Sequence, residues 1–167
     1  MSVGRLDRSF FLGPTVQVAQ DLLGKRLTFQ KFSGIITETE AYHQDDDPAC
    51  HAYRGKTPRN APMFGPAGHS YVYFIYGMYH CLNIVTEPEG IAAAVLIRGL
   101  KIDQINLNGP GKLCRYLKIT KDHNDIDLMT SNYFYVSDEG AKPQFISTPR
   151  IGIRKGQTIL WRFVTQS

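Results

Sequence analysis

Cysteine is scarce in this chain, and its three cysteines are far apart. They stand at positions 50, 81 and 114 of 167 residues. They form neither the even, dense set of a disulfide framework nor the C-x-x-C pairs of a structural zinc site. The spacing indicates reduced intracellular thiols.

Long apolar runs and the common nucleotide and hydrolase motifs are also missing. The longest apolar run, 91–97, is far too short to cross a bilayer, and residues 1–7 lack the apolar core of a signal peptide. There is no Walker loop, no G-x-G-x-x-G after a strand, no G-x-S-x-G and no H-E-x-x-H. We therefore expect no metal, no organic cofactor and no membrane partner, in a cytoplasmic, nucleoid-associated or nuclear protein.

Positive charge is only in mild excess in this sequence. Nineteen Lys and Arg residues against 15 Asp and Glu residues give a formal charge of +4, and the sequence pI is about 9.0. This suits a polyanionic partner better than an anionic small substrate. The length is enough for one domain with a substantial core, so we expect a single domain over 1–167.

Turn residues and apolar spacing predict the elements of the first two thirds of the chain. Gly13-Pro14-Thr15 is typical of a helix start, and apolar residues recur at helical spacing as far as Leu23. Residues 26–30 and 34–42 are predicted strands, joined by a short hairpin at 31–33. Residues 79–86 and 91–100 flank a turn at 87–90, which predicts a long antiparallel hairpin.

The last third is less patterned. Gly109-Pro110-Gly111 predicts a helix start, with the helix continuing through Leu117. Lys112 lies near the amino end of that helix, where backbone N–H groups and a lysine could hold a phosphate, although an ordinary helix start is the alternative. Short strands are predicted at 133–136, 150–153 and 159–164.

Two glutamates occupy positions where a buried strand would carry Val or Ile. They lie in Glu38-Thr39-Glu40-Ala41-Tyr42, and alternation places Glu38 and Glu40 on the same face. A sequence tolerates such a conflict most often for function. A surface glutamate is the alternative, above all for Glu38.

Aromatic residues are concentrated between positions 71 and 79. Tyrosines at 71, 73, 76 and 79 form a rigid amphipathic set that suits stacking on flat ligands such as nucleobases. An aromatic core strand is the alternative. Phenylalanine would serve a plain core better.

A long polar connection runs from residue 43 to residue 68. Loops of this length in a compact domain are functional or mobile, and this one carries Arg54, Lys56, Arg59 and Asn60. A solvated surface loop is the alternative, and the three aspartates at 45–47 indicate solvation locally.

These motifs, taken in order, resemble the alkyladenine (3-methyladenine) DNA glycosylase family. The resemblance runs from about residue 5 to residue 164, and no single piece of it is specific. It is carried by Glu38-Thr39-Glu40-Ala41-Tyr42, His51, Thr57-Pro58-Arg59-Asn60, Met63-Phe64, Tyr71-Val72-Tyr73, Tyr76-Gly77-Met78-Tyr79, Asn83, Arg98 and Gly109-Pro110-Gly111-Lys112-Leu113-Cys114.

The resemblance implies a fold and a reaction. The fold is one α+β domain with a curved, mainly antiparallel sheet, surrounding helices and a protruding aromatic hairpin, similar to a formyltransferase carboxy-terminal domain. The activity is that of a monofunctional glycosylase.

 Such an enzyme would act as a monomer on double-stranded DNA that contains damaged purines. It would flip an alkylated or deaminated purine out of the stack and hydrolyse its N-glycosidic bond.

The resemblance also implies roles for individual residues. Glu40 would be the catalytic carboxylate that activates a water, with Arg98 and the main chain at Ile151 positioning that water. The base pocket would consist of Tyr42, His51, Tyr73 and Asn83. Tyr76 and Met78 would fill the gap left by the flipped base, and phosphates would bind Thr57, Arg59, Asn60 and Lys112.

Two other classes of function remain open from the residues alone. A non-catalytic nucleic-acid binder would keep the aromatic residues and the basic loop but would not need a carboxylate in the pocket. A hydrolase of free nucleosides would need no residue to fill the gap in a duplex.

Overall fold

A single antiparallel sheet organises the protein in the computed structural model. The structure describes residues 4–44, 47, 49–50, 52–53, 55–153 and 155–166. Within these residues ten strands join one open sheet, and every strand pair in it is antiparallel. Short helices accompany the sheet, so the predicted α+β class is confirmed.

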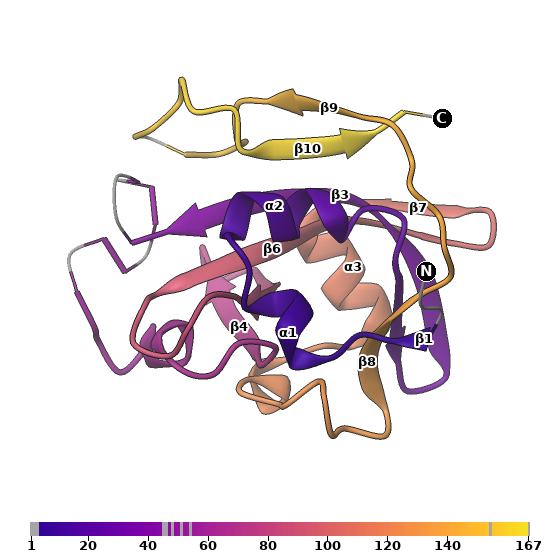
Figure 1. The fold of residues 1–167 in the computed structure, drawn as a ribbon, viewed down its shortest axis with the longest axis horizontal. Helices are drawn as coiled ribbons and strands as arrows, with labels where there is room; N and C mark the ends of the chain where they lie inside the picture. Colours follow the sequence, from indigo (N-terminus) through magenta and orange to yellow (C-terminus); the bar gives the residue numbers. More distant parts are fainter. Residues whose placement is uncertain are drawn as a thin grey trace.

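Figure 1 shows the arrangement of these elements. The helices are α1 (Arg8–Phe11), α2 (Thr15–Asp21) and α3 (Pro110–Leu117), with 3₁₀ turns at Ala61–Phe64 and Lys121–His123. The strands are β1 (Gly4–Arg5), β2 (Arg26–Phe29), β3 (Phe32–His43), β4 (Ser70–Ile75), β5 (Tyr79–Val85), β6 (Ala93–Ile102), β7 (Ile105–Asn108), β8 (Phe134–Asp138), β9 (Phe145–Thr148) and β10 (Arg162–Thr165).

The long strand β3 lies at the centre of the sheet. The main path runs β1-β8-β2-β3-β6-β5-β4, and β10 pairs with both β3 and β9. Along one edge β3 pairs first with β2 and then with β10, while β6 covers its other edge. The carboxy-terminal hairpin therefore completes the sheet beside residues 38–40 (Figure 1).

Alternation divides the side chains of β4, β5 and β6 between two clusters. The larger core cluster takes Val72, Leu82, Ile84, Val95 and Ile97, whereas the smaller cluster takes Tyr71, Tyr73, Cys81, Ala94 and Leu96. Successive residues of a strand point to opposite faces, so the two clusters lie on opposite faces of the sheet. The tyrosines of β4 thus lie together on one face.

Helix α2 covers β3 on the side of the larger cluster. Val18, Ala19 and Leu22 are buried there, and the hydroxyl of Thr39 donates to the carbonyl of Ala19 at 2.8 Å. With no side-chain cap from its own N-cap residue, the helix start is held by Glu87, whose carboxylate accepts from the backbone N–H and from the hydroxyl of Thr15.

The predicted hairpins and helices are largely confirmed, with three corrections. The β2–β3 turn consists of Gln30 and Lys31, where Gln30 has a φ of 55°, so Phe32 and Ser33 belong to β3. The predicted strand at 150–153 is wrong, because the chain bends there, with Gly152 at a left-handed φ of 74°, and the strand lies earlier, in β9. The terminal strand begins at Arg162 rather than at residue 159.

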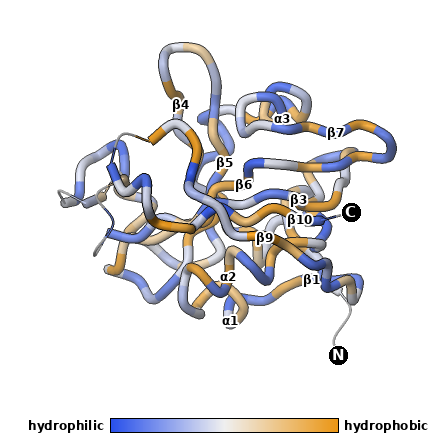
Figure 2. Tube along the Cα trace, turned by 90° about the horizontal axis from the view of Figure 1, so that it is seen from above, coloured by the Kyte–Doolittle hydropathy of each residue, from blue (hydrophilic) through white to orange (hydrophobic). Residues whose placement is uncertain are grey.

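The β4–β5 hairpin projects from the body of the molecule, as predicted. Figure 2 shows its turn standing clear of the other strands. Residues Tyr76, Gly77 and Met78 form the turn, because Ile75 pairs with Tyr79. The aromatic hairpin is therefore available to a partner.

Candidate active site

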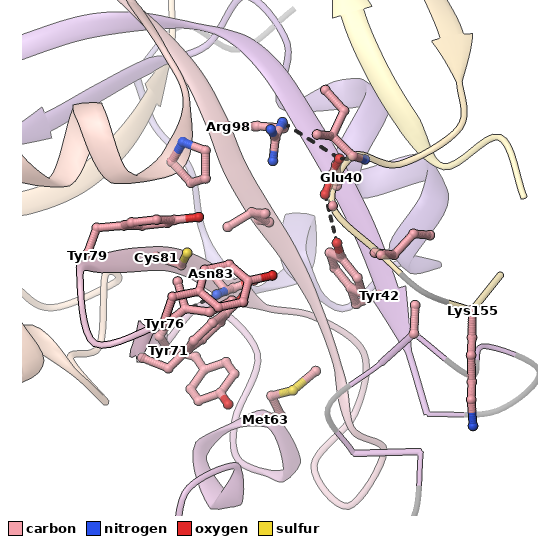
Figure 3. Close-up of a pocket in the computed structure, with 18 residues that line it drawn as sticks. Glu40, Tyr42, Met63, Tyr71, Tyr76, Tyr79, Cys81, Asn83, Arg98 and Lys155 are labelled. Carbon is pink, nitrogen blue, oxygen red and sulfur yellow. Dashed lines mark hydrogen bonds and ion pairs between the residues drawn. The ribbon is translucent and has the colours of Figure 1, made fainter. Parts of the chain in front are cut away.

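A cavity of about 540 Å³ opens on the face of the sheet that carries the tyrosines. Figure 3 shows Glu40, Tyr42 and Arg98 on one side of it, and the tyrosines of the hairpin on the other. The wall is formed by Glu40, Tyr42, Ala49, Met63, Tyr71, Tyr73, Ile75, Tyr76, Tyr79, Cys81, Asn83, Leu96, Arg98, Pro110, Ile151, Gly152, Ile153 and Lys155. Strands β3 to β6 supply most of it through alternate positions.

Glu40 is a fully buried carboxylate in the wall of this cavity. Its exposed fraction is 0%. The hydroxyl of Tyr42 donates to Oε1 at 2.7 Å, and the backbone N–H of Ile151 donates to Oε2 at 2.8 Å. Arg98 supplies the positive charge, with Nε 3.7 Å from Oε2. A buried carboxylate with such partners is held in one orientation.

The hydroxyl of Tyr42 remains a donor over the whole ordinary pH range. Burial raises the pKa of Tyr42, and the neighbouring Glu40 carboxylate raises it further. The phenol therefore stays protonated, so Tyr42 donates the hydrogen bond and the Glu40 carboxylate accepts it.

Glu38 is not a plain surface glutamate. Its Oε2 lies 3.2 Å from Nε of Arg98 and 2.9 Å from Nε of Arg162. Both glutamates therefore contact Arg98 from β3, which agrees with the shared face that alternation predicts. A bulge around residues 37–39 adjusts the pairing of β3 with β6 at this point.

The aromatic wall comes from the β4–β5 hairpin. The rings of Tyr71 and Tyr73 lie 5.4 Å apart at an angle of 39°, and the amide of Asn83 donates to the carbonyl of Tyr71 at 3.2 Å. Tyr42, Tyr73 and Asn83, three of the four predicted pocket residues, thus line one cavity with Glu40. The fourth, His51, lies outside the described residues.

The turn of the hairpin exposes two large apolar side chains. Tyr76 is 68% exposed and Met78 is 70% exposed. Tyr76 and Gly77 have φ values of 56° and 62°, a left-handed conformation that is uncommon for a tyrosine. The backbone therefore holds Tyr76 outward at the mouth of the cavity rather than in a core.

The four predicted phosphate contacts do not line the cavity. Thr57 and Lys112 are exposed, while Arg59 donates to the carbonyl of Phe74 at 2.7 Å and so braces the hairpin. Asn60 is buried, accepts from the N–H of Thr57 at 2.6 Å and donates to Gly55 at 3.0 Å. Its amide orders the loop locally.

Sequence reasoning missed a buried ion pair behind the cavity. Arg150 donates to both oxygens of Asp47 at 2.7 Å and to the carbonyl of Ala41 at 3.0 Å. Asp47 is fully buried, so the expected solvation is wrong for this aspartate. No sequence pattern pairs residues so far apart. The only weak signal was a charged residue, Arg150, in a segment predicted as a strand.

Comparison with known proteins agrees with this geometry. A family model described as methylpurine-DNA glycosylase (MPG) matches residues 9–167. A protein of Sodalis glossinidius is 60% identical over 161 residues, 95% of either chain. One of Wolbachia pipientis wMel is 59% identical over 166 residues, 98% of this chain and 92% of its own. Both bear the name "Putative 3-methyladenine DNA glycosylase".

The chain belongs to the methylpurine-DNA glycosylase family. The resemblance seen in the sequence is therefore confirmed. The protein is a DNA repair enzyme that hydrolyses N-glycosyl bonds, and DNA is its substrate. In the part of this glycosylase that the structure describes, no helix is long and apolar enough to cross a membrane.

The buried pair predicts a large stability effect. Arg150→Met should lower the free energy of unfolding by about 3–5 kcal/mol, because it leaves Asp47 buried without a cation. Urea denaturation followed by circular dichroism measures this. Arg26→Gln is the control, since its pair with Glu139 is partly exposed and should contribute less than about 1 kcal/mol. Equal losses in the two variants would contradict the role of the pair.

The buried thiols predict a pH effect. Burial raises the pKa of Cys81 to about 11 and that of Cys50 to about 12, from an ordinary value of 9.0. The folded protein therefore keeps protons that the unfolded chain releases above pH 9, so its stability is full below pH 9 and declines toward pH 11.

A thiol reagent and denaturation at several pH values test this effect. At pH 8 Ellman's reagent should react slowly with Cys50 and Cys81 in the folded protein and rapidly in urea, because the thiolate is the nucleophile. The urea midpoint should fall between pH 9 and pH 11. Rapid labelling of folded Cys81 at pH 8 would show that the thiol is not buried.

Proposed function

We propose that this protein is a monofunctional glycosylase that flips damaged purines out of duplex DNA and hydrolyses their N-glycosidic bond with a water activated by Glu40. The observation that carries the proposal is the fully buried Glu40 carboxylate in an aromatic cavity. The proposed substrates are 3-methyladenine, 7-methylguanine, hypoxanthine and ethenoadenine in duplex DNA. The proposed acting form is a monomer.

Glu40 is the proposed base for the attacking water. A carboxylate has about four lone-pair sites, and Tyr42 and Ile151 each use one of them. The attacking water is proposed to bind one of the remaining sites, on the cavity side. As the bond from C1′ to the base breaks, the electron pair leaves with the base, the water oxygen bonds to C1′, and Glu40 takes the proton.

Arg98 and Ile151 are the proposed positioning groups for that water. Both border the cavity beside Glu40, and both contact its Oε2. A water that bonds to the carboxylate there is within reach of the guanidinium and of the main chain at Ile151. The positive charge of Arg98 also suits the phosphate beside a flipped nucleotide.

The tyrosines are the proposed selectivity element. A cavity of about 540 Å³ is within the usual size of a small-ligand site. Tyr42, Tyr71 and Tyr73 line it, and their rings are the proposed stacking partners of a base. Positively charged alkylated purines stack better on electron-rich rings than neutral ones and leave without prior protonation. Asn83 is the proposed residue that crowds the amino group of guanine.

The proposed enzyme cleaves the N-glycosidic bond and leaves the DNA strand unbroken. A lyase step needs an amine that attacks the sugar. Lys155 borders the cavity, yet Figure 3 shows its side chain running away from Glu40. Duplexes treated with the protein in EDTA should therefore break only after alkali, and breaks before alkali would contradict the monofunctional assignment.

Glu40→Gln should bind lesion duplexes like the parent but excise about 10²- to 10⁴-fold more slowly, the usual range for loss of a general base. Single-turnover excision from methylated DNA, with the protein in excess, measures the rate. Glu139→Gln removes the same charge from an exposed position and serves as the matched control. A Glu40→Gln variant with the same excision rate as the parent would contradict the proposed mechanism.

Tyr76→Ala should weaken flipping and leave the fold intact, because the side chain is 68% exposed. Loss of one stacking contact, about 1–3 kcal/mol, lowers affinity for a lesion duplex about 5- to 150-fold. Fluorescence of 2-aminopurine placed beside the lesion reports flipping. Tyr116→Ala, at an exposed tyrosine outside the cavity, is the control, and equal effects would contradict the assignment of Tyr76.

A further inference from the structure

Arg98 is shared between two carboxylates, and the nearer one is not the proposed catalytic group. Its Nε lies 3.2 Å from Oε2 of Glu38 and 3.7 Å from Oε2 of Glu40. Both ion pairs run through Nε, the inner nitrogen of the guanidinium. Arg98 also lines the cavity.

Glu38 is in turn held by a second arginine from the other side. Nε of Arg162 lies 2.9 Å from the same Oε2, and Nη1 of Arg162 donates to the hydroxyl of Thr148 at 3.1 Å. Because β3 lies between β6 and β10, the order of charges across the three strands is Arg98, Glu38, Arg162.

The sheet is shaped to allow this contact. Gly99 lies opposite Glu38, and a Cβ added to Gly99 would come within 2.8 Å of the Cβ of Glu38. Only glycine lets β6 approach β3 so closely at this point. Arg98, the preceding residue, therefore enters the cavity face beside both glutamates.

The second arginine changes what Arg98 can do. With Arg98 as its sole cation, Glu38 would compete with Glu40 for the same guanidinium. Arg162 compensates the charge of Glu38, so the charge of Arg98 stays available to Glu40 and to a substrate phosphate. The side chains of Glu38, Arg98 and Arg162 are only 13%, 16% and 20% exposed, so solvent screens these contacts incompletely.

We propose that Glu38 and Arg162 are positioning residues that hold Arg98 for excision. The inference rests on the proposed function, because it assigns to Arg98 a part in the reaction. Neither residue lines the cavity, so both act through Arg98 rather than on the substrate.

Arg162→Gln tests the inference through the rate of excision. The single-turnover rate on methylated DNA should fall about 10- to 100-fold, the scale expected when a reacting group is displaced. Lesion binding should change far less than the rate. It is measured with Glu40→Gln added to both the parent and the Arg162→Gln variant, so that the base is not excised during the measurement. Arg162→Lys should recover part of the rate because it restores the charge.

A double-mutant cycle separates positioning from a merely structural role. If Arg162 acts through Arg98, then Arg162→Gln causes little further loss of rate in a chain that already carries Arg98→Gln. Arg26→Gln is the matched control, since Arg26 lies on β2 of the same sheet and its Nε also lies 2.9 Å from a carboxylate, that of Glu139. Thermal unfolding verifies that each variant is folded, and Glu38→Gln provides a second variant that should show the same pattern.

The outcomes distinguish this inference from the proposed function. If the parent is active, two results overturn the positioning role alone. One is an Arg162→Gln variant that excises as fast as the parent. The other is an Arg162→Gln substitution that lowers the rate by the same factor whether residue 98 is Arg or Gln. A parent that excises nothing, or a Glu40→Gln variant as active as the parent, overturns the proposed function and the inference with it.

Discussion

The buried guanidinium of Arg150 is the interaction on which the candidate site depends. It bonds to both oxygens of Asp47 and to the carbonyl of Ala41, and it lies over the rings of Tyr42 and Trp161 at 4.8 Å and 5.3 Å. One side chain thus joins the end of β3, the polar connection and the segment before β10. Because Ile151 follows directly, the same anchor fixes the N–H that contacts Glu40.

The site also depends on a balance of charge along β3. Two carboxylates on one face of a strand repel each other and lose hydration on burial. Arg98 from β6 and Arg162 from β10 compensate them from the two sides. The carboxy-terminal strand therefore does more than extend the sheet, since it carries Arg162, the second cation that pairs with Glu38.

The hairpin places a rigid aromatic surface opposite this charged wall. Its cavity face contains Tyr71 and Tyr73, while Val72 between them packs into the larger core. The core thus fixes the strand from behind, and the left-handed Tyr76 and Gly77 turn the chain outward. A flat ligand would meet rings whose positions are set before it arrives, which limits the entropy lost on binding.

Local patterns in the sequence determined much of the fold. The 87–90 turn between apolar runs, the Gly-Pro start of α3 and the alternation along β3 are properties of neighbouring residues, so they can be interpreted without coordinates. The same alternation already placed Glu38 and Glu40 on one face. Together with the spacing of the motifs, it was sufficient to identify the family.

Only the tertiary structure decided the contacts between distant segments. Asp47 and Arg150 are 103 residues apart, and Glu38 and Arg162 are 124 apart. No periodicity links such positions, so Asp47 resembled a solvated loop residue and Arg150 a strand residue. Their roles follow from burial: removal from water makes an unpaired charge costly, and the fold is the arrangement that brings each charge to its partner.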